Sequence, residues 1–408
     1  MRQLYPPLWE GLNVALRDIF EGGYPADKVI QRQLKAQRKW GSSDRRLFAE
    51  AVYDIVRWWR KLLFVIDVPW PEDDRWTNAD PKILIAVIEA WCLLNDVELG
   101  KSVARSGLNK NKLVETWRDE TLPRSVRQSI PDWLDAWAME QLPDRWDELL
   151  TVLNQQAPVF LRANRLKTTP EKLVAQLKAE NISARLVEHD AIQLEKRTNV
   201  FLTKSFKAGQ FEVQDHSSQR VARFLAPEPG ERVIDACAGA GGKSLHMAAL
   251  MGNKGRVLSL DVAEVKLEQL RERATRAGAN CIEVKVIDST KVIKRLADNA
   301  DRLLLDVPCS GLGVLRRNPD SKWKLSREEV KHVQGLQSEI LSRYSSMCKV
   351  GGTMVYATCS MMPKENERQV ESFLSQNERS WQLESQLTCW PEVGGSDGFF
   401  MARLKRLS

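Results

Sequence analysis

The second half of the chain alternates short apolar segments with amphipathic ones, and this alternation constrains the fold more than any other feature. From Ser217 onward, runs such as ERVIDAC, RVLSLD, IEVKVID, RLLLDVP and TMVYATC are separated by runs such as AEVKLEQLRERATRAG and EEVKHVQGLQSEILSRYSSMCK. Apolar strands that alternate with amphipathic helices form a parallel sheet covered by helices on both faces. The sequence therefore predicts an α/β domain with a doubly wound sheet over residues 213–408.

Residues 1–145 have a different pattern, which predicts an all-helical domain. In SSDRRLFAEAVYDIVRWWRKLL, apolar residues recur every three or four positions, and this spacing predicts one amphipathic helix that begins near Ser43 and Asp44. PKILIAVIEAWCLLND predicts a second, more buried helix. Eleven of the 14 tryptophans lie between Trp9 and Trp146, and we expect them to pack between helices.

Residues 146–212 predict a small α/β domain between these two parts. PVFLRAN, ARLVEH and AIQLE have the composition of strands, and TTPEKLVAQLKAEN that of a capped amphipathic helix. A platform of this size with β-α-β-β order is typical of RRM-like domains that bind RNA, although a purely structural linker domain is the alternative. The length of 408 residues agrees with three domains.

The charge is distributed unevenly along the chain. The formal net charge is +7, but residues 1–150 hold 22 Lys and Arg against 24 Asp and Glu, and the remainder holds 39 against 30. A basic excess of this kind favours a polyanionic partner such as nucleic acid. A soluble surface that happens to be basic accounts for the charge equally well.

Several partners are not expected from the composition. No apolar run approaches the length of a membrane span, and MRQLYPPLWEGLN lacks the apolar segment of a signal peptide, so we expect a cytoplasmic protein. The seven cysteines are odd in number and scattered, no CxxC pair occurs, and there are only four histidines. We therefore expect neither a disulfide framework nor a metal site.

Ligands of such sheets bind at the carboxyl ends of the strands, where this chain carries glycines and acids. The first strand runs into a glycine-rich turn between Asp235 and Ser244, and the next two strands end at Asp261 and Asp288. Acids at these places are suited to ribose hydroxyls and to an adenine amino group. A cluster of acids also suits a cation such as the sulfonium of S-adenosylmethionine, although each Asp alone could be a helix N-cap.

Two cysteines lie at the ends of later strands. RLLLDVPCSG brings Asp306 and Cys309 to the end of the fourth strand, and TMVYATC brings Cys359 to the end of another. Two thiols at the ligand-binding edge of one sheet, in a chain without a zinc pattern, favour thiol chemistry. We expect Cys92, Cys281, Cys348 and Cys389 to be structural.

The segments DACAGAGGKS, DVPCSGLGVLRRNPDSKW, YATCSMMPKENE and DGFFMARL resemble the motifs of RNA (cytosine-5) methyltransferases of the Sun/Nol/Nop (RsmB-like) group. The resemblance covers about residues 157–405 and implies a class I S-adenosylmethionine-dependent methyltransferase fold with a Rossmann-like sheet. The N-terminal part, residues 1–145, more weakly resembles the NusB-like RNA-binding domain of the bacterial 16S rRNA members. The chain departs from the family loop at Gly239 and Ala240, which replace Ala-Pro, and has a His after Asp215 instead of a small residue.

The resemblance also implies the role of individual residues. Cys359 is the expected nucleophile, Cys309 the residue for product release, and Asp306 the residue that recognises and activates the base. The expected cofactor shell consists of Cys237, Ala238, Gly239, Ala240, Gly241, Gly242, Lys243, Asp261, Asp288 and Asp306. Arg316 and Arg317 follow the PCSG loop and are expected to hold RNA phosphate, with a solvated basic pair as the alternative. The sequence does not assign a role to Lys243.

The implied activity is methylation of carbon 5 of a cytosine in RNA by a monomer, with 16S ribosomal RNA as the first expected substrate and transfer RNA as the second. One alternative is a P-loop NTPase, but GxxxxGK[ST] needs glycine at the position of Cys237. Cytosine-5 methylation of DNA is another, although DNA enzymes of this chemistry lack the TC cysteine. The non-enzymatic alternative is an RNA-binding assembly factor.

Overall fold

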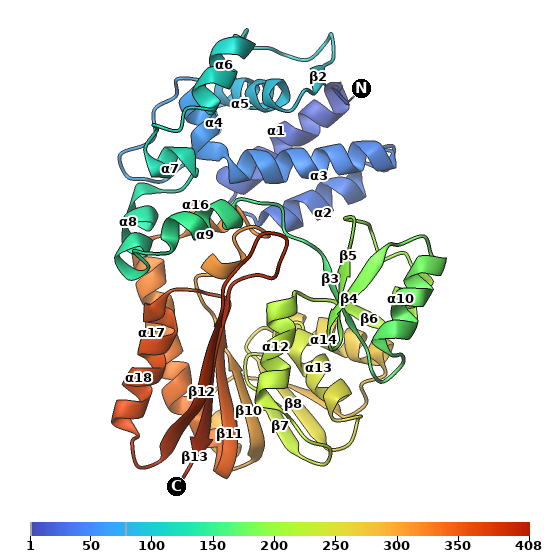
Figure 1. Cartoon of the computed structure of the whole chain (residues 1–408), viewed down its shortest axis with the longest axis vertical. Coiled ribbons are helices and arrows are strands. Elements are labelled where there is room, and N and C mark those ends of the chain that lie inside the picture. The colour runs from blue at the N-terminus through green and yellow to red at the C-terminus, as the bar shows by residue number, and fades with distance from the viewer. Residues whose placement is uncertain (1, 78–79) are drawn as a thin grey trace. The chain divides into compact units, whose positions relative to one another are not determined.

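The computed structural model describes residues 2–77 and 80–408, and the chain divides into two compact units (Figure 1). The helical unit comprises Met1–Gln156 and Leu315–Arg327. The α/β unit comprises Ala157–Val314 and Glu328–Ser408. Within the described ranges, no helix combines the length and the apolar character needed to cross a membrane.

Helices make up most of the helical unit. They are α1 (Pro6–Phe20), α2 (Ala26–Ala36), α3 (Ser42–Arg57), α4 (Trp59–Val65), α5 (Pro81–Leu94), α6 (Lys110–Trp117), α7 (Arg124–Arg127), α8 (Asp132–Gln141), α9 (Trp146–Leu153) and α16 (Ser321–Lys324). Strands β1 (Gln3–Leu4) and β2 (Glu98–Leu99) pair in parallel. Because α9 belongs to this unit, the helical part extends past residue 145 to residue 156.

The structure has two helices, α3 and α4, where the sequence predicted one long helix from Ser43. The helix is interrupted at Trp58. Helix α3 also begins earlier than predicted, at Ser42, and Asp44 accepts a hydrogen bond from the Gly41 N–H at 3.1 Å. A break leaves carbonyl groups at the end of α3 without helical partners. The side chains of Trp323 and Lys322 supply donors there, to Val56 O at 2.6 Å and to Arg57 O at 2.8 Å.

Tryptophans pack within the core of the helical unit, as the sequence predicted. Trp59 is fully buried and stacks on Phe20 at 4.1 Å between ring centroids. Trp76 meets Trp59 edge-on at 5.8 Å, and Trp323 lies 5.5 Å from Trp70. Aromatic pairs in these arrangements add to the stabilisation that burial provides.

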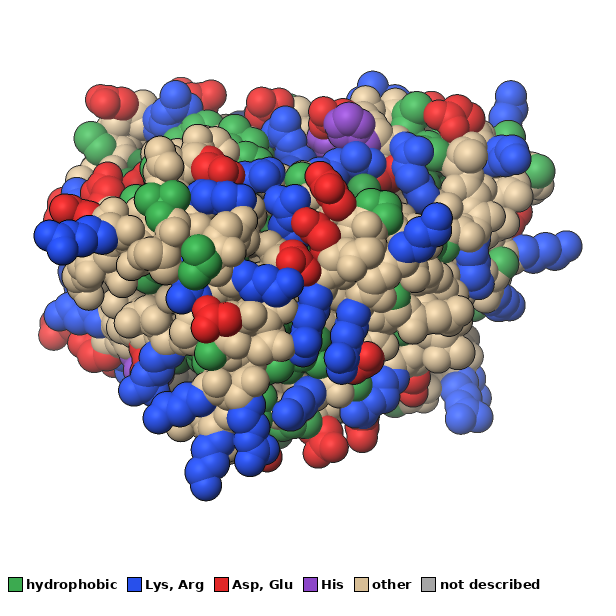
Figure 2. All heavy atoms as spheres, turned by 90° about the horizontal axis from the view of Figure 1, so that it is seen from below, with side chains coloured by type: hydrophobic (Ala, Val, Ile, Leu, Met, Phe, Trp, Pro, Cys, Tyr) green, Lys and Arg blue, Asp and Glu red, His purple; other side chains and the backbone are tan. Residues whose placement is uncertain are grey.

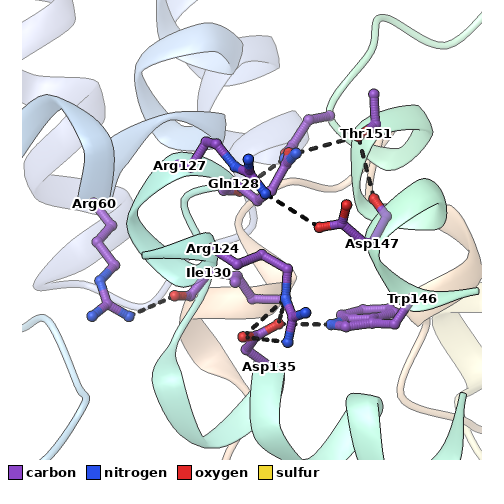
Figure 3. A network of polar contacts seen from close by, with 10 residues as sticks. Arg60, Arg124, Arg127, Gln128, Ile130, Asp135, Trp146, Asp147 and Thr151 are labelled. Carbon is purple, nitrogen blue, oxygen red and sulfur yellow. Dashed lines mark hydrogen bonds and ion pairs between the residues drawn. The ribbon is translucent and has the colours of Figure 1, made fainter. Parts of the chain in front are cut away.

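Polar contacts join α7, α8 and α9 (Figure 3). Asp135 of α8 accepts two hydrogen bonds from Arg124 of α7, from Nε at 2.9 Å and Nη2 at 3.0 Å, and a third from the Trp146 indole at 2.8 Å. Arg127 and Asp147 form a looser ion pair at 3.4 Å. Asp135 therefore connects three short helices, none of which is long enough to be stable alone.

The segment Leu315–Arg327 follows the PCSG loop in sequence but lies in the helical unit. The Lys322 side chain is buried there, and burial lowers its pKa well below the usual value. Lys322 donates at the carboxyl end of α3, where the helix dipole favours positive charge. These contacts join residues that are far apart in sequence, so no local pattern reveals them. For this reason the sequence predicted that the segment belongs to the catalytic domain, residues 213–408.

The α/β unit contains a small sheet with four antiparallel strands in the order β4-β5-β3-β6. The elements are β3 (Phe160–Ala163), α10 (Pro170–Ala179), β4 (Ala184–Glu188), β5 (Ala191–Leu194), α11 (Lys204–Lys207) and β6 (Phe211–Val213). The three strands and the helix predicted from the sequence are all present. The fourth strand, β6, closes the other edge against β3.

The main sheet has seven strands in the order β12-β13-β11-β10-β7-β8-β9. The strands are β7 (Arg232–Asp235), β8 (Arg256–Asp261), β9 (Ile282–Val286), β10 (Ala300–Asp306), β11 (Cys348–Thr358), β12 (Trp381–Cys389) and β13 (Phe399–Arg406). Strands β7 to β11 are parallel, which confirms the doubly wound prediction, and β13 runs antiparallel to β11 and β12. The strand order reverses at β7, the usual place for a ligand.

Helices cover both faces of this sheet (Figure 1). The helices are α12 (His216–Leu225), α13 (Gly242–Leu250), α14 (Glu264–Ala277), α15 (Thr290–Arg295), α17 (Arg327–Tyr344) and α18 (Glu367–Gln376). Residues of α12, α13 and α14 share one apolar core with the sheet, and residues of α15, α17 and α18 share another. This is the two-faced burial that makes parallel strands apolar throughout.

Candidate active site

The glycine-rich turn joins β7 to α13. Gly241 has φ +80°, and a Cβ there would lie 2.3 Å from Leu270 Cγ, so this position requires glycine. Arg162 of the small sheet donates to Gly242 O at 2.6 Å, and Arg273 donates to Ala240 O at 2.6 Å. The two guanidinium groups therefore hold the turn through its carbonyl groups.

Of the two acids predicted at the next strand ends, Asp261 contacts this turn. Asp261, the last residue of β8, accepts hydrogen bonds from the N–H groups of Gly239 and Ala263, both at 2.8 Å. Asp288 follows β9, is exposed, and accepts from the Ser289 hydroxyl at 3.0 Å. Asp261 thus connects the glycine-rich turn to β8 and also accepts a hydrogen bond from the residue that precedes α14.

Asp235 lies under the turn and is almost completely buried. Its carboxylate accepts a hydrogen bond from the Ser244 hydroxyl at 2.6 Å. Burial raises the pKa of Asp235 to about 7, and the nearby Asp306 adds to the effect. Burial and the same two acids also raise the pKa of Cys237 well above its usual value, so this cysteine is not an activated thiol.

The residues from Cys237 to Lys243 fit an adenosine cofactor that carries a positive charge. The backbone from Ala238 to Ala240 is partly exposed, and a Cβ built on Gly239 would meet no atom of the described residues within 4 Å. Open space above the turn lets a ligand approach the backbone closely. Asp261, the last residue of β8, and Asp288, two residues after the end of β9, remain the predicted acceptors for such a group.

Cys309 and Cys359 lie side by side at the carboxyl ends of two paired strands. Asp306 at the end of β10 is opposite Ala357 of β11, and each strand leads directly into one cysteine loop. The two Sγ atoms are 3.1 Å apart. The hydrogen bond to Cys359 raises the pKa of Cys309 well above its usual value, and burial adds to this shift. Cys309 therefore keeps its proton.

Lys243 bridges the cofactor turn and the cysteines. Its ammonium group lies 2.5 Å from the Asp306 carboxylate, and both side chains are largely buried. Burial opposes the charged form of Lys243, but Asp306 outweighs it and raises the pKa of this lysine, with a further contribution from Cys359. The role that the sequence left open for Lys243 is thus to pair with Asp306 close to the thiols.

Two residues that hold the cysteine loops from behind were not predicted from the sequence. Glu365 and Gln337 are fully buried; Glu365 accepts from the Ser310 hydroxyl at 2.8 Å, and Gln337 donates to Pro308 O at 2.9 Å. Glu365 lies in the YATCSMMPKENE segment that resembles a family motif, and this was the available signal, because its neighbours Lys364 and Asn366 are polar. No such signal marks Gln337, which lies on the polar pattern of α17.

The two arginines predicted to hold RNA are not equivalent. Arg316 is only 2% exposed within the helical unit, so the structure does not support a phosphate contact by this side chain. Arg317 is half-buried, and its predicted contact stays a prediction. Figure 2 shows one face of the molecule, where Lys and Arg side chains are scattered with Asp and Glu between them. On the side chains drawn there, positive charge does not gather into a single track.

Comparison with known proteins identifies the family of the chain. The model of the 16S rRNA methyltransferase RsmB/F family matches residues 222–405, and that of the RsmF/B-like ferredoxin-like domain matches residues 130–201. The chain is 31% identical to the probable ribosomal RNA small subunit methyltransferase B of Synechocystis sp., over 96% of this chain and 97% of that one. It is 38% identical to ribosomal RNA small subunit methyltransferase B of Proteus mirabilis, over 68% of this chain and 65% of the relative.

A solved structure extends the likeness of the fold to nearly the whole chain. The crystal structure of PH0851 has a TM-score of 0.81 at 21% identity, and the match covers 99% of this chain and 100% of that one. Fold, site and relatives together define an S-adenosylmethionine-dependent methyltransferase that acts on RNA. More particularly, the chain belongs to the RsmB/F family.

Proposed function

We propose that the protein methylates carbon 5 of a cytosine in RNA through a transient covalent bond between Cys359 and carbon 6 of the base. The proposal rests on one observation. The sulfurs of Cys309 and Cys359 lie 3.1 Å apart, at the same edge of the sheet as the cofactor turn. Methyl transfer to oxygen or nitrogen does not need a thiol, whereas transfer to carbon 5 of cytosine does.

The chemistry explains why a thiol is required. Carbon 5 of cytosine is a weak nucleophile, and addition of a thiolate at carbon 6 gives the ring enamine character. The cofactor supplies an electrophilic methyl group on its sulfonium. Loss of the carbon-5 proton and expulsion of the thiolate restore the aromatic ring, and thiolate both adds and leaves readily.

Cys359 is the proposed nucleophile and Cys309 the proposed partner for release. Cys309 keeps its proton and can share it with the sulfur of Cys359, so the two thiols are not interchangeable. The Lys243 ammonium offers positive charge to a thiolate at Cys359. Before attack, the Cys359 proton passes to solvent. After methyl transfer, solvent accepts the carbon-5 proton, and the Cys309 thiol donates a hydrogen bond to the departing Cys359 thiolate.

Asp306 is the proposed contact for the base. It lies at the end of β10 with its carboxylate on Lys243, three residues before Cys309. A carboxyl group there can bond to the ring nitrogen and the amino group that distinguish cytosine from uracil. A cytosine in a duplex must leave the base stack to reach this site.

Ribosomal RNA of the small subunit is the proposed substrate. Two relatives of the chain are named as ribosomal RNA small subunit methyltransferase B, one of them as probable. The charge balance beyond residue 150 favours a polyanion, in agreement with this substrate. We propose 16S rRNA before transfer RNA for these reasons.

The decisive experiment compares RNA methylated by the wild-type chain and by Cys359→Ala. Purified small-subunit RNA is incubated with S-adenosylmethionine, digested to nucleosides and analysed by mass spectrometry, and the position is read by bisulfite sequencing. We expect 5-methylcytosine at one site with the wild type and none with Cys359→Ala. A methyl group on another atom, or full activity of Cys359→Ala, would contradict the proposal.

A further inference from the structure

A buried carboxylate lies behind the two cysteines. Glu365 has no exposed surface and ends the short 3-10 helix η3 (Pro363–Glu365), which follows the Cys359 loop. Its two oxygens accept from the Ser310 N–H at 3.1 and 3.3 Å, and Oε2 also accepts from the Ser310 hydroxyl at 2.8 Å. A side chain that follows Cys359 in sequence is thus attached to the residue next to Cys309.

The residues after the two cysteines are also joined to each other. The hydroxyl oxygens of Ser310 and Ser360 are 3.3 Å apart, and Ser360 Oγ accepts from the Met362 N–H at 3.2 Å. Ser360 follows Cys359 directly, as Ser310 follows Cys309. Glu365, Ser310 and Ser360 therefore form one buried connection between the two cysteine loops, which we call the loop brace.

The loop brace has a rigid support. The Tyr356 hydroxyl on β11 donates to Glu365 O at 2.6 Å. The neighbouring Asn366 accepts from the Thr358 hydroxyl at 2.6 Å and donates to Ser360 O at 3.1 Å. All of these groups are buried, so the carboxylate is fixed to β11 and not to a mobile surface loop.

Burial of a carboxylate in this place costs free energy, so its presence indicates a function. Burial raises the pKa of Glu365, which is the sign of a disfavoured charge. The Ser310 donors satisfy the carboxylate, but an apolar side chain would fill the same space without the cost. The pKa of Cys309, raised first by Cys359 and by burial, is raised further by the charge of Glu365.

We propose that Glu365 is a positioning residue, which holds the Cys309 loop against the Cys359 loop so that the two sulfurs meet. This rests on the proposed function, since its consequence for catalysis is the release of product by Cys309. Without the loop brace, Cys359 still attacks the base, but Cys309 no longer lies where it assists release. The Glu365 carboxylate bonds to Ser310, and a hydrogen bond with Ser360 also acts on it, so it positions Cys309 through the loop backbone.

A first test needs no RNA and measures the approach of the sulfurs directly. Diamide oxidises two neighbouring thiols to a disulfide: one S–S bond forms, and two electrons and two protons reduce the N=N bond of the reagent. The rate of Cys309–Cys359 formation in the full chain is followed by peptide mass spectrometry. We expect Glu365→Ala to form this disulfide several-fold more slowly than wild type.

Two further variants make this test specific. Glu365→Gln keeps the shape but has one acceptor oxygen where the carboxylate has two, so we expect a rate between those of Glu365→Ala and wild type. Glu367→Gln changes a neighbouring acid that bonds to Thr388 instead, and we expect the wild-type rate. Equal rates for Glu365→Ala and wild type would overturn the proposal. If Glu365→Ala does not fold, a wild-type rate for Glu365→Gln overturns it.

A second test uses labelled RNA and separates positioning from general damage. We expect Glu365→Ala to lower turnover by about 100-fold, the order of effect that a misplaced group produces. The covalent protein–RNA adduct on denaturing gels should increase at the same time, because attack continues while release fails. A fall of adduct in proportion to turnover would overturn the proposal. If the wild type makes no 5-methylcytosine, the proposed function fails, and the diamide rates still report on Glu365.

Discussion

At Cys309 and Cys359, two identical side chains have different surroundings. The hydrogen bond between them and the burial of Cys309 keep a proton on Cys309, while Lys243 places a positive charge near Cys359. A thiol that keeps its proton is a poor nucleophile and a usable donor. The division of labour therefore follows from the contacts of each sulfur and not from the residue type.

The Cys309→Ala variant is expected to trap the reaction after attack. The nucleophile Cys359 is intact, but release of the methylated base loses its assistance, so protein and RNA remain linked. Labelled RNA should then migrate with the protein on a denaturing gel. Cys281→Ala, a half-buried thiol outside the site, is the control and should leave the gel unchanged. An adduct that forms with Cys359→Ala and not with Cys309→Ala would reverse the assigned roles.

Asp235 predicts a specific dependence of stability on pH. Its folded-state pKa of about 7 is above the usual 3.8, so the folded chain binds this proton more tightly than the unfolded chain. Stability from this group is complete below pH 4 and is lost as pH rises to 7, by up to about 4 kcal/mol. Asp235→Asn should remove that loss.

The measurement is urea unfolding of wild type and Asp235→Asn between pH 5 and 8. The free energy of unfolding of Asp235→Asn relative to wild type should rise with pH up to about 7 and level off above it. A difference that does not change with pH would show that Asp235 titrates near its usual value in the folded chain.

At the scale of single elements, short helices depend on side chains that connect them. Asp135 receives Arg124 and the Trp146 indole and is mostly buried, whereas Asp147 faces Arg127 from an exposed position (Figure 3). We expect Asp135→Ala to lower the free energy of unfolding of the helical unit by about 2 kcal/mol, because the half-buried Arg124 guanidinium and the buried Trp146 indole lose their acceptor.

Asp147→Ala is the matched control for Asp135→Ala. The Arg127–Asp147 pair is solvent-exposed, so its loss should cost less than about 1 kcal/mol. Both values come from urea titrations followed by tryptophan fluorescence, since 11 tryptophans precede residue 147. Equal losses for the two variants would show that the contacts of Asp135 do not stabilise the helices.

The elements that could be predicted are those with a strong local pattern. Strands β7, β8, β10 and β11 were found from their apolar runs, and β9 from apolar residues that alternate with Glu283 and Lys285. The cysteines and acids at the strand ends followed from the parallel arrangement. Strand β12 was missed, because most of its residues are exposed or half-buried and it has no apolar run. The break at Trp58 was missed because the residues that satisfy the end of α3, Lys322 and Trp323, are distant in sequence.

At the scale of the whole molecule, the helical unit is built from two separate pieces of chain. Trp323 is 9% exposed, belongs to the apolar core of this unit, and donates to Val56 O. Trp323→Ala should destabilise the helical unit by about 3–5 kcal/mol, the usual cost of truncating a large aromatic side chain in a core. Urea unfolding of the full chain measures this loss.

The sequence placed Trp323 in the catalytic domain, so the outcome distinguishes the two assignments. Trp381, a buried tryptophan of β12 in the core of the α/β unit, is the control. Limited proteolysis should detect earlier cleavage within residues 2–156 for Trp323→Ala and within residues 328–408 for Trp381→Ala. Cleavage of Trp323→Ala confined to the α/β unit would contradict the assignment of the segment to the helical unit.

The two-piece construction of the helical unit also sets an order of events during translation. Residues 2–156 leave the ribosome first, but Trp323 and Lys322, which serve the end of α3, are made only after the whole stretch from residue 157 to 314. Domains usually fold as they emerge, N-terminal first. The helical unit is therefore the first to be synthesised, but its core cannot be completed until residue 327 has been made. By then, the cofactor turn and the PCSG loop have already been synthesised.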